Sequence, residues 1–164
     1  KAALALVAAG IPFRIVPGIT AATGGLAYAG IPVTHRDTNS AVTFITGHAI
    51  GGSIPDGLDW QALAQGSPVL VFYMGLKHIG EIAARLIAAG RSPAEAVALV
   101  AHATTARQQV IETDLAGVTA VEAPALIVVG EVVRLRSGLD WLGALSGRVL
   151  DADPLDLKAE RDAG

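Results

Sequence analysis

The sequence predicts an α/β protein whose mixed, mainly parallel sheet is flanked by helices. Short apolar runs, typical of buried strands, alternate along the chain with Ala-rich or amphipathic segments typical of helices. Aromatic residues make up only 4% of the chain, so the apolar residues are mainly Ala, Val, Ile and Leu, which fill buried parallel sheets. One helix-ending pattern, a glycine followed within three residues by a proline, recurs at Gly10, Gly30 and Gly90.

The first elements follow from this punctuation. An Ala-rich segment is expected to be helical and to end at Gly10. Phe13–Val16 is expected to form a short strand, which the following Pro-Gly pair terminates. Thr20 then stands where it can cap a helix over Ala21–Ala29.

The rest of the chain continues to alternate. β-branched and apolar composition predicts strands at Ala41–Thr46, Pro68–Tyr73, Ala96–Ala101, Gln109–Glu112 and Ala125–Val129. Helices are predicted from Asp59 through Ala64, over the amphipathic segment Lys77–Ala89, and in part of Val132–Leu145. Helical crossovers favour parallel pairing, whereas the short loop Thr104–Arg107 predicts one antiparallel pair. Residues 47–57 are predicted to be a loop, and Asp151–Gly164 a polar, frayed tail.

Length and composition limit the organisation of the chain. Its 164 residues suffice for one domain or two small ones. Charged residues make up 16%, whereas ordinary globular domains carry about 25%. Either an Ala-rich genome produces this composition, or another domain or subunit covers part of the surface.

Charge, cysteine content and hydropathy argue against several function classes. A net charge of −3 without any Lys/Arg run argues against nucleic acid or an anionic membrane as partner. No apolar stretch approaches the roughly 20 residues that span a bilayer. The absence of cysteine excludes disulfides and thiolate metal sites and fits a cytoplasmic protein. The four histidines lack metal-ligand spacing, so no metal is expected.

Three backbone-rich corners remain as candidate binding elements, since there is no dinucleotide fingerprint or phosphate loop. They are the turn Pro17–Ala21 and the ends of two predicted strands, Tyr73–Gly75 and Ala101–Thr105. Ligands of open α/β sheets bind at the carboxyl ends of strands. Amides, a hydroxyl and a thioether suit a neutral or cationic small molecule; the alternative is that these are ordinary connections between elements.

The order of these corners resembles the uroporphyrinogen-III C-methyltransferases of the tetrapyrrole methylase family. The resemblance covers Lys1 to about Leu145 and rests on the segments Ile15–Ala21, Gly25–Arg36, Val42–His48, Leu58–Trp60, Val71–Lys77 and Ala125–Val133. It implies methylation of uroporphyrinogen III to precorrin-2, through precorrin-1, at the entry to cobalamin and sirohaem biosynthesis. S-adenosyl-L-methionine is then the cofactor and S-adenosyl-L-homocysteine the product. Family members are homodimers of two-domain subunits that hold the cofactor between the domains.

The resemblance also implies a domain assignment. Residues 1–145 correspond to the C-terminal α/β domain of such an enzyme, and residues 146–164 form a polar tail. The family's N-terminal domain, with its Gly-rich cofactor loop and acid/base candidates, has no counterpart here. A second departure lies at Ala120–Val121, where relatives have a longer Ala-rich helix. No catalytic residue or proton acceptor is assigned.

Site residues follow from the resemblance. Thr20 and Ala21 are expected to touch the methionine part of the cofactor and Met74 to pack near its adenosine, with close backbone approach at Ala103 and Ala125. The substrate is a polycarboxylate, so cationic side chains should face it. We expect this role for His35, Arg36 and His48, with Lys77 and Arg107 as further candidates.

Two other functions stay open on the sequence alone. A precorrin methyltransferase for another ring position would share the pocket chemistry but not the substrate. A non-catalytic half-domain that only dimerises or binds a partner is the alternative from a different class, because these residues alone cannot form a two-domain cleft.

Overall fold

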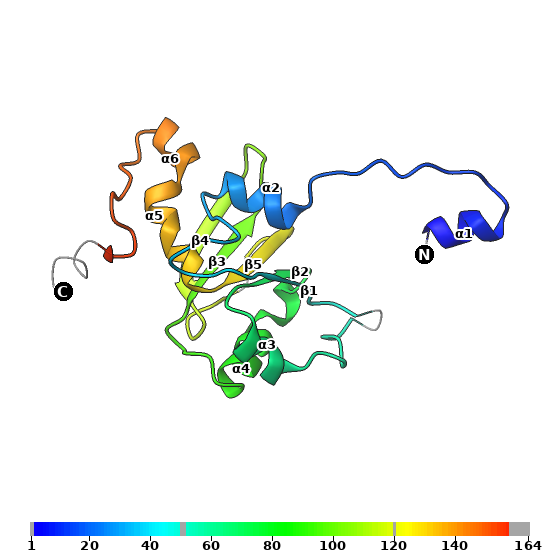
Figure 1. Cartoon of the computed structure of the whole chain (residues 1–164), viewed down its shortest axis with the longest axis horizontal. Coiled ribbons are helices and arrows are strands. Elements are labelled where there is room, and N and C mark those ends of the chain that lie inside the picture. Colours follow the sequence, from blue (N-terminus) through cyan, green and yellow to red (C-terminus); the bar gives the residue numbers. More distant parts are fainter. Residues whose placement is uncertain (1, 50–51, 120, 158–164) are drawn as a thin grey trace.

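A five-stranded sheet in the order β1-β2-β5-β3-β4 forms the centre of the computed structural model, which describes residues 2–49, 52–119 and 121–157 (Figure 1). The strands are β1 (Thr43–Thr46), β2 (Leu70–Tyr73), β3 (Ala96–Ala101), β4 (Gln109–Asp114) and β5 (Ala125–Val129). The helices are α1 (Ala2–Ala8), α2 (Ala21–Tyr28), α3 (Trp60–Gly66), α4 (Ile79–Ala88), α5 (Arg136–Leu139) and α6 (Trp141–Leu145), with 3-10 turns η1 (Leu76–His78) and η2 (Glu131–Leu135).

The three central strands are buried on both faces, which explains their uninterrupted apolar sequences. Side chains alternate between two cores, as the period of two requires. Val71, Val100 and Val128 face the core beneath α2 and η2. The alternate residues, such as Phe72 and Leu99, face the core beneath α3 and α4.

The sheet is mixed, as predicted, but it is not mainly parallel. Among the described strands only β1 and β2 pair in parallel; the pairs β2–β5, β5–β3 and β3–β4 are antiparallel. The last of these is the antiparallel pair expected around Thr104–Arg107. Helix α4 does join two strands of the same direction, β2 and β3, but β5 inserts between them and converts one parallel contact into two antiparallel ones.

Local signals set the helix boundaries much as predicted. Gly10, Gly30 and Gly90 all adopt positive φ, so they end their helices in the left-handed conformation. Asp59 caps α3 by accepting a hydrogen bond from the Ala62 amide at 2.9 Å. The predicted helix Lys77–Ala89 is divided into η1 and α4.

The predicted strand Phe13–Val16 is wrong. Residues 9–20 form no helix or strand and are exposed, and they connect α1 to the body as one extended segment (Figure 1). A strand needs a neighbour for its backbone groups, and the described chain places none beside this segment.

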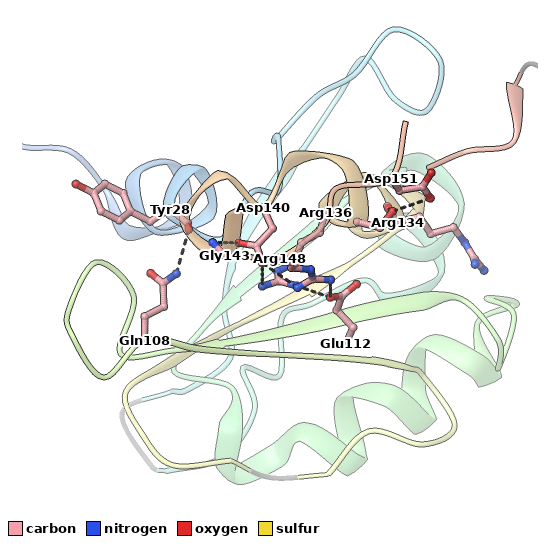
Figure 2. A network of polar contacts seen from close by, with 10 residues as sticks. Tyr28, Gln108, Glu112, Arg134, Arg136, Asp140, Gly143, Arg148 and Asp151 are labelled. Atoms are coloured by element: carbon pink, nitrogen blue, oxygen red, sulfur yellow. Dashed lines mark hydrogen bonds and ion pairs between the residues drawn. The ribbon is translucent and has the colours of Figure 1, made fainter. Parts of the chain in front are cut away.

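A buried ion network fixes the C-terminal helices to the edge strand β4 (Figure 2). Arg136 is 8% exposed and donates to Glu112 Oε1 on β4 at 2.6 Å and to Asp140 Oδ2 at 2.8 Å. Arg148 also donates to Asp140 Oδ2, at 2.8 Å. Asp140 in turn caps α6 by accepting from the Gly143 amide.

The described part of the tail is docked rather than frayed. The amide of Asp151 donates to the carbonyl of Ser137 at 2.9 Å, and Leu155 packs against the core beneath α2. Residues 158–164 of the predicted tail lie outside the described residues, as does Ala120 of the predicted departure. In the described ranges no helix combines the length and hydropathy that crossing a bilayer demands.

Candidate functional site

A cavity of about 710 Å³ lies where the carboxyl ends of β2 and β3 and the start of β5 meet the first turn of α2. Four of the five predicted cofactor-binding residues line it, namely Ala21, Met74, Ala103 and Ala125. The structure therefore brings together the three corners singled out in the sequence, at the sheet edge where α/β proteins bind ligands.

The fifth predicted residue, Thr20, adjoins the cavity through Tyr73. Thr20 occupies the position before α2 but makes no side-chain capping hydrogen bond, contrary to expectation. Its hydroxyl instead contacts the Tyr73 hydroxyl, which also accepts a hydrogen bond from the Ala22 amide at 2.9 Å. Tyr73 thus supplies the cap, and two hydroxyls meet at the rim of the cavity.

Met74 sits in a strained turn directly after β2. Its φ is +55° and it is 61% exposed, a conformation and a location that a bulky apolar residue rarely adopts. The neighbouring glycine makes this turn possible, since a Cβ at Gly75 would lie 2.9 Å from Ile82 Cδ1. A Cβ at Gly47 would approach Gly75 Cα to 2.6 Å, so the end of β1 packs directly on the same turn.

The end of β3 forms the opposite wall. His102 follows the last strand residue with φ +46° and is 8% exposed. Beside it, Ala103 touches α2 so closely that a Cβ at Gly25 would lie 2.9 Å from the Ala103 Cβ. Small residues therefore let the helix and the strand end approach each other at the cavity.

The charge of the cavity is positive. Lys77 and Arg107 line it together with His48 and His102, and none of the described lining residues is acidic. Such a lining favours anionic groups on a ligand. No group of three or more His, Asp or Glu side chains in the described ranges could hold a metal ion.

Two of the predicted substrate-binding residues, His35 and Arg36, do not line this cavity. They belong to a tight turn organised by Asn39, whose side-chain oxygen accepts from the His35 amide at 3.2 Å. The imidazole of His35 lies 3.6 Å from the Asp37 carboxylate, and Arg36 is exposed.

Three polar residues of the cavity, Tyr73, His102 and Thr105, lie in the corners predicted from the sequence, but sequence reasoning gave them no individual role. Tyr73 and His102 directly precede Met74 and Ala103, so their position after apolar strands was the available signal. The contact from Tyr73 to Thr20 spans 53 residues, and no local pattern reports such a contact.

Comparisons with known proteins point to one family. A family model described as Tetrapyrrole (Corrin/Porphyrin) Methylases matches residues 1–119. A uroporphyrinogen-III C-methyltransferase of Sinorhizobium sp is 62% identical over 158 residues, which cover 93% of this chain and 56% of the relative. Siroheme synthase 2 of Serratia proteamaculans is 51% identical over 140 residues, 83% of this chain and 29% of that protein.

A solved structure matches as well. The uroporphyrin-III C-methyl transferase from Thermus thermophilus, complexed with S-adenyl homocysteine, aligns with a TM-score of 0.70 and 34% identity, covering 81% of this chain and 59% of that one. The chain thus spans little more than half the length of the uroporphyrinogen-III methyltransferases it matches. Because the family model covers more than half of its residues, the chain belongs to the tetrapyrrole methylase family.

Proposed function

We propose that the chain supplies one wall of the cofactor cleft in a methyltransferase that converts uroporphyrinogen III into precorrin-2. The observation that carries this proposal is the convergence of Ala21, Met74, Ala103 and Ala125 on one cavity. The names of the similar proteins, and the S-adenyl homocysteine in one of them, support the same activity.

The residues present fit S-adenosyl-L-methionine, which brings a methyl group on a sulfonium, already an activated electrophile. The Thr20 and Tyr73 hydroxyls lie at the start of α2 and can bind the polar methionine end. Met74 offers an adaptable apolar surface to the adenosine. Ala103 and Ala125 permit close approach of a ligand to the backbone.

The positive lining suits a polycarboxylate substrate. Lys77, Arg107 and His48 can hold carboxylates beside the cofactor. These residues would orient an electron-rich pyrrole carbon against the sulfonium methyl group, and this alignment would provide most of the acceleration. The C–S bond would break as the C–C bond forms, with S-adenosyl-L-homocysteine as the leaving group and loss of one proton from the substrate. The support for a similar role of His35 and Arg36 is the family resemblance alone.

The assembly is part of the proposal. Residues 1–145 act as the C-terminal domain of a two-domain subunit, residues 146–164 follow it, and two such subunits form a homodimer. Light scattering on the complete protein tests this arrangement, and a concentration-independent monomer mass would contradict it.

Thr20→Val tests the placement of the cofactor. It is measured in the completed chain, meaning this sequence joined to the part of the Sinorhizobium relative that it does not cover. Removal of the hydroxyl leaves a ligand group unpaired, which costs about 1–3 kcal/mol, or roughly five- to 150-fold in affinity for S-adenosyl-L-methionine. Calorimetric titration measures the affinity, and thermal unfolding measures the stability.

Thr23→Val is the matched control for the loss of a hydroxyl in the same turn, since Thr23 is exposed and does not line the cavity. Its hydroxyl donates to the Thr20 carbonyl, which the Thr23 and Gly24 amides also bond. Thr23→Val should leave the affinity unchanged. If Thr20→Val lowers the melting temperature but not the affinity, the hydroxyl pair with Tyr73 is structural and the turn does not bind the cofactor.

A further inference from the structure

We propose that His102 recognises the adenosine part of the ligand through its buried imidazole nitrogen Nε2. This inference rests on the proposed function and deepens it, because it assigns a polar contact to a residue that the family resemblance did not single out. His102 lines the cavity with Ala103 after β3, and Met74 lines it after β2.

The first support is an unsatisfied polar atom. Nε2 of His102 is buried and has no hydrogen-bond partner. The nearest carboxylate oxygen, Oε1 of Glu122, is 3.6 Å away on a side chain that is 76% exposed. Buried polar atoms are nearly always paired, so the unpaired Nε2 of this cavity-lining residue points to a partner that the ligand supplies when the exposed Glu122 side chain moves aside.

The second support is the way the backbone of His102 is held. Its amide donates to the Pro124 carbonyl at 2.9 Å, and its carbonyl accepts from the Thr105 amide at 3.2 Å and the Thr105 hydroxyl at 2.8 Å. These bonds hold the residue at φ +46°. A left-handed residue other than glycine persists only where its surroundings fix it, and such residues gather at binding sites.

The third support concerns which end of the ligand lies here. On the strand side of His102 the wall is formed by the small and apolar residues Val100, Ala103, Ala125 and Leu126, and Thr105 and Arg107 line it on the loop that follows. Such a wall fits the flat face of a purine, whose ring edge carries nitrogen donors and acceptors. The imidazole Nε2 can donate or accept according to its tautomer. The hydroxyls of Thr20 and Tyr73 are better suited to the polar methionine end.

Nuclear magnetic resonance of the 164-residue chain tests this contact directly. The chain has four histidines and one methionine, so ring carbon–proton signals and the Met74 methyl signal can be assigned with His→Asn variants and Met74→Leu. S-adenosyl-L-homocysteine, adenosine and methionine are added separately at millimolar concentration. We expect the His102 and Met74 signals to shift with the first two ligands and not with methionine.

His78 is the internal control. Its Nε2 already bonds to the Gly52 carbonyl at 2.7 Å, and it does not line the cavity. Its signal should stay in place. A shift of Met74 without a shift of His102 would overturn the inference and leave the proposed function standing.

If no resonance shifts on addition of the ligands, the affinity of the completed chain for S-adenosyl-L-homocysteine provides the test. His102→Gly removes the imidazole without straining the backbone and should weaken S-adenosyl-L-homocysteine binding roughly five- to 150-fold, whereas His102→Asn should restore part of it. Equal affinity of the parent and His102→Gly would overturn the inference. Absence of binding by the parent chain would instead overturn the proposed function.

Discussion

At the scale of single residues, backbone strain is concentrated at the cavity. Three of the four described non-glycine residues with positive φ are Met74, His102 and Thr104. Each such residue costs about 1–3 kcal/mol. Glycine would adopt a positive φ at these positions without strain. The larger side chains found there are consistent with a role in binding.

Met74→Gly tests that cost. Met74 is 61% exposed at φ +55°, so glycine relieves strain and removes little buried surface. We expect the free energy of unfolding of the 164-residue chain to rise by about 0.5–1 kcal/mol, and cofactor affinity of the completed chain to fall.

Ala84→Gly is the control for the first measurement, because Ala84 is exposed in the middle of helix α4. It should lower the free energy of unfolding by about 1 kcal/mol. A comparable loss for Met74→Gly would show that the methionine contributes to packing and that its turn is not strained.

At the scale of elements, buried ion pairs attach the peripheral segments to the sheet. Arg136 and Arg134 lie two residues apart, yet the Arg136 side chain is 9% exposed and that of Arg134 is 53% exposed (Figure 2). The first pairs with Glu112 and Asp140, and the second with Glu131 at the surface.

Replacement of each arginine by alanine should therefore have different effects. Arg136→Ala removes the buried guanidinium that joins Glu112 to Asp140, whereas Asp140 keeps its hydrogen bond from Arg148. It should destabilise the chain by about 1–3 kcal/mol. Arg134→Ala should cost less than about 1 kcal/mol. Chemical denaturation of both variants measures the difference; similar losses would mean that the network does not hold α5 and α6 to β4.

Arg91 connects the turn after α4 to the segment before β2. Arg91 pairs with Glu95 and donates to the Ser67 carbonyl. Burial raises the pKa of the Glu95 carboxyl above 4.5, and the attraction of Arg91 only partly opposes this effect. The folded chain then binds more protons than the unfolded chain just above pH 4.5.

Stability should consequently fall as pH rises through the raised pKa of Glu95, and this loss should be absent in Glu95→Gln. We expect the free energy of unfolding of the parent, relative to that variant, to increase as the pH is lowered from neutral towards 4.5. Denaturation series at several pH values measure it. A flat difference would contradict the raised pKa.

Elements were predictable where local chemistry decides them. The bounds of β3 and β5 match the uninterrupted apolar runs Ala96–Ala101 and Ala125–Val129, and glycines end the helices where expected. Strand order was not predictable, because insertion of β5 between β2 and β3 depends on tertiary packing. Phe13–Val16 has the composition of a strand but does not form one, because strand pairing also depends on tertiary packing. The corners of the cavity were found from the sequence, whereas the contact of Tyr73 with Thr20 was not.

At the scale of the whole molecule, the N-terminal segment exposes apolar side chains that a free-standing domain would bury. Leu4, Val7, Ile15, Val16 and Ile19 are 60–86% exposed. The segment joins the body at α2 and carries α1 away from the sheet (Figure 1). The first residue of α2, Ala21, lines the cavity. This favours the second explanation for the low charge content, namely that another domain or subunit covers part of the surface.

The 164-residue chain alone is therefore expected to bind S-adenosyl-L-methionine weakly and not to methylate uroporphyrinogen III. The cavity is walled here by one domain, so a bound cofactor would keep one side in water and lose the contacts that a second domain supplies. A loss of at least about 2.7 kcal/mol corresponds to ~100-fold in affinity. Calorimetric titrations of the 164-residue and completed chains, under identical conditions, measure the ratio. Micromolar binding by the shorter chain would show that this domain holds a complete site, and the proposed cleft between two domains would have to be abandoned.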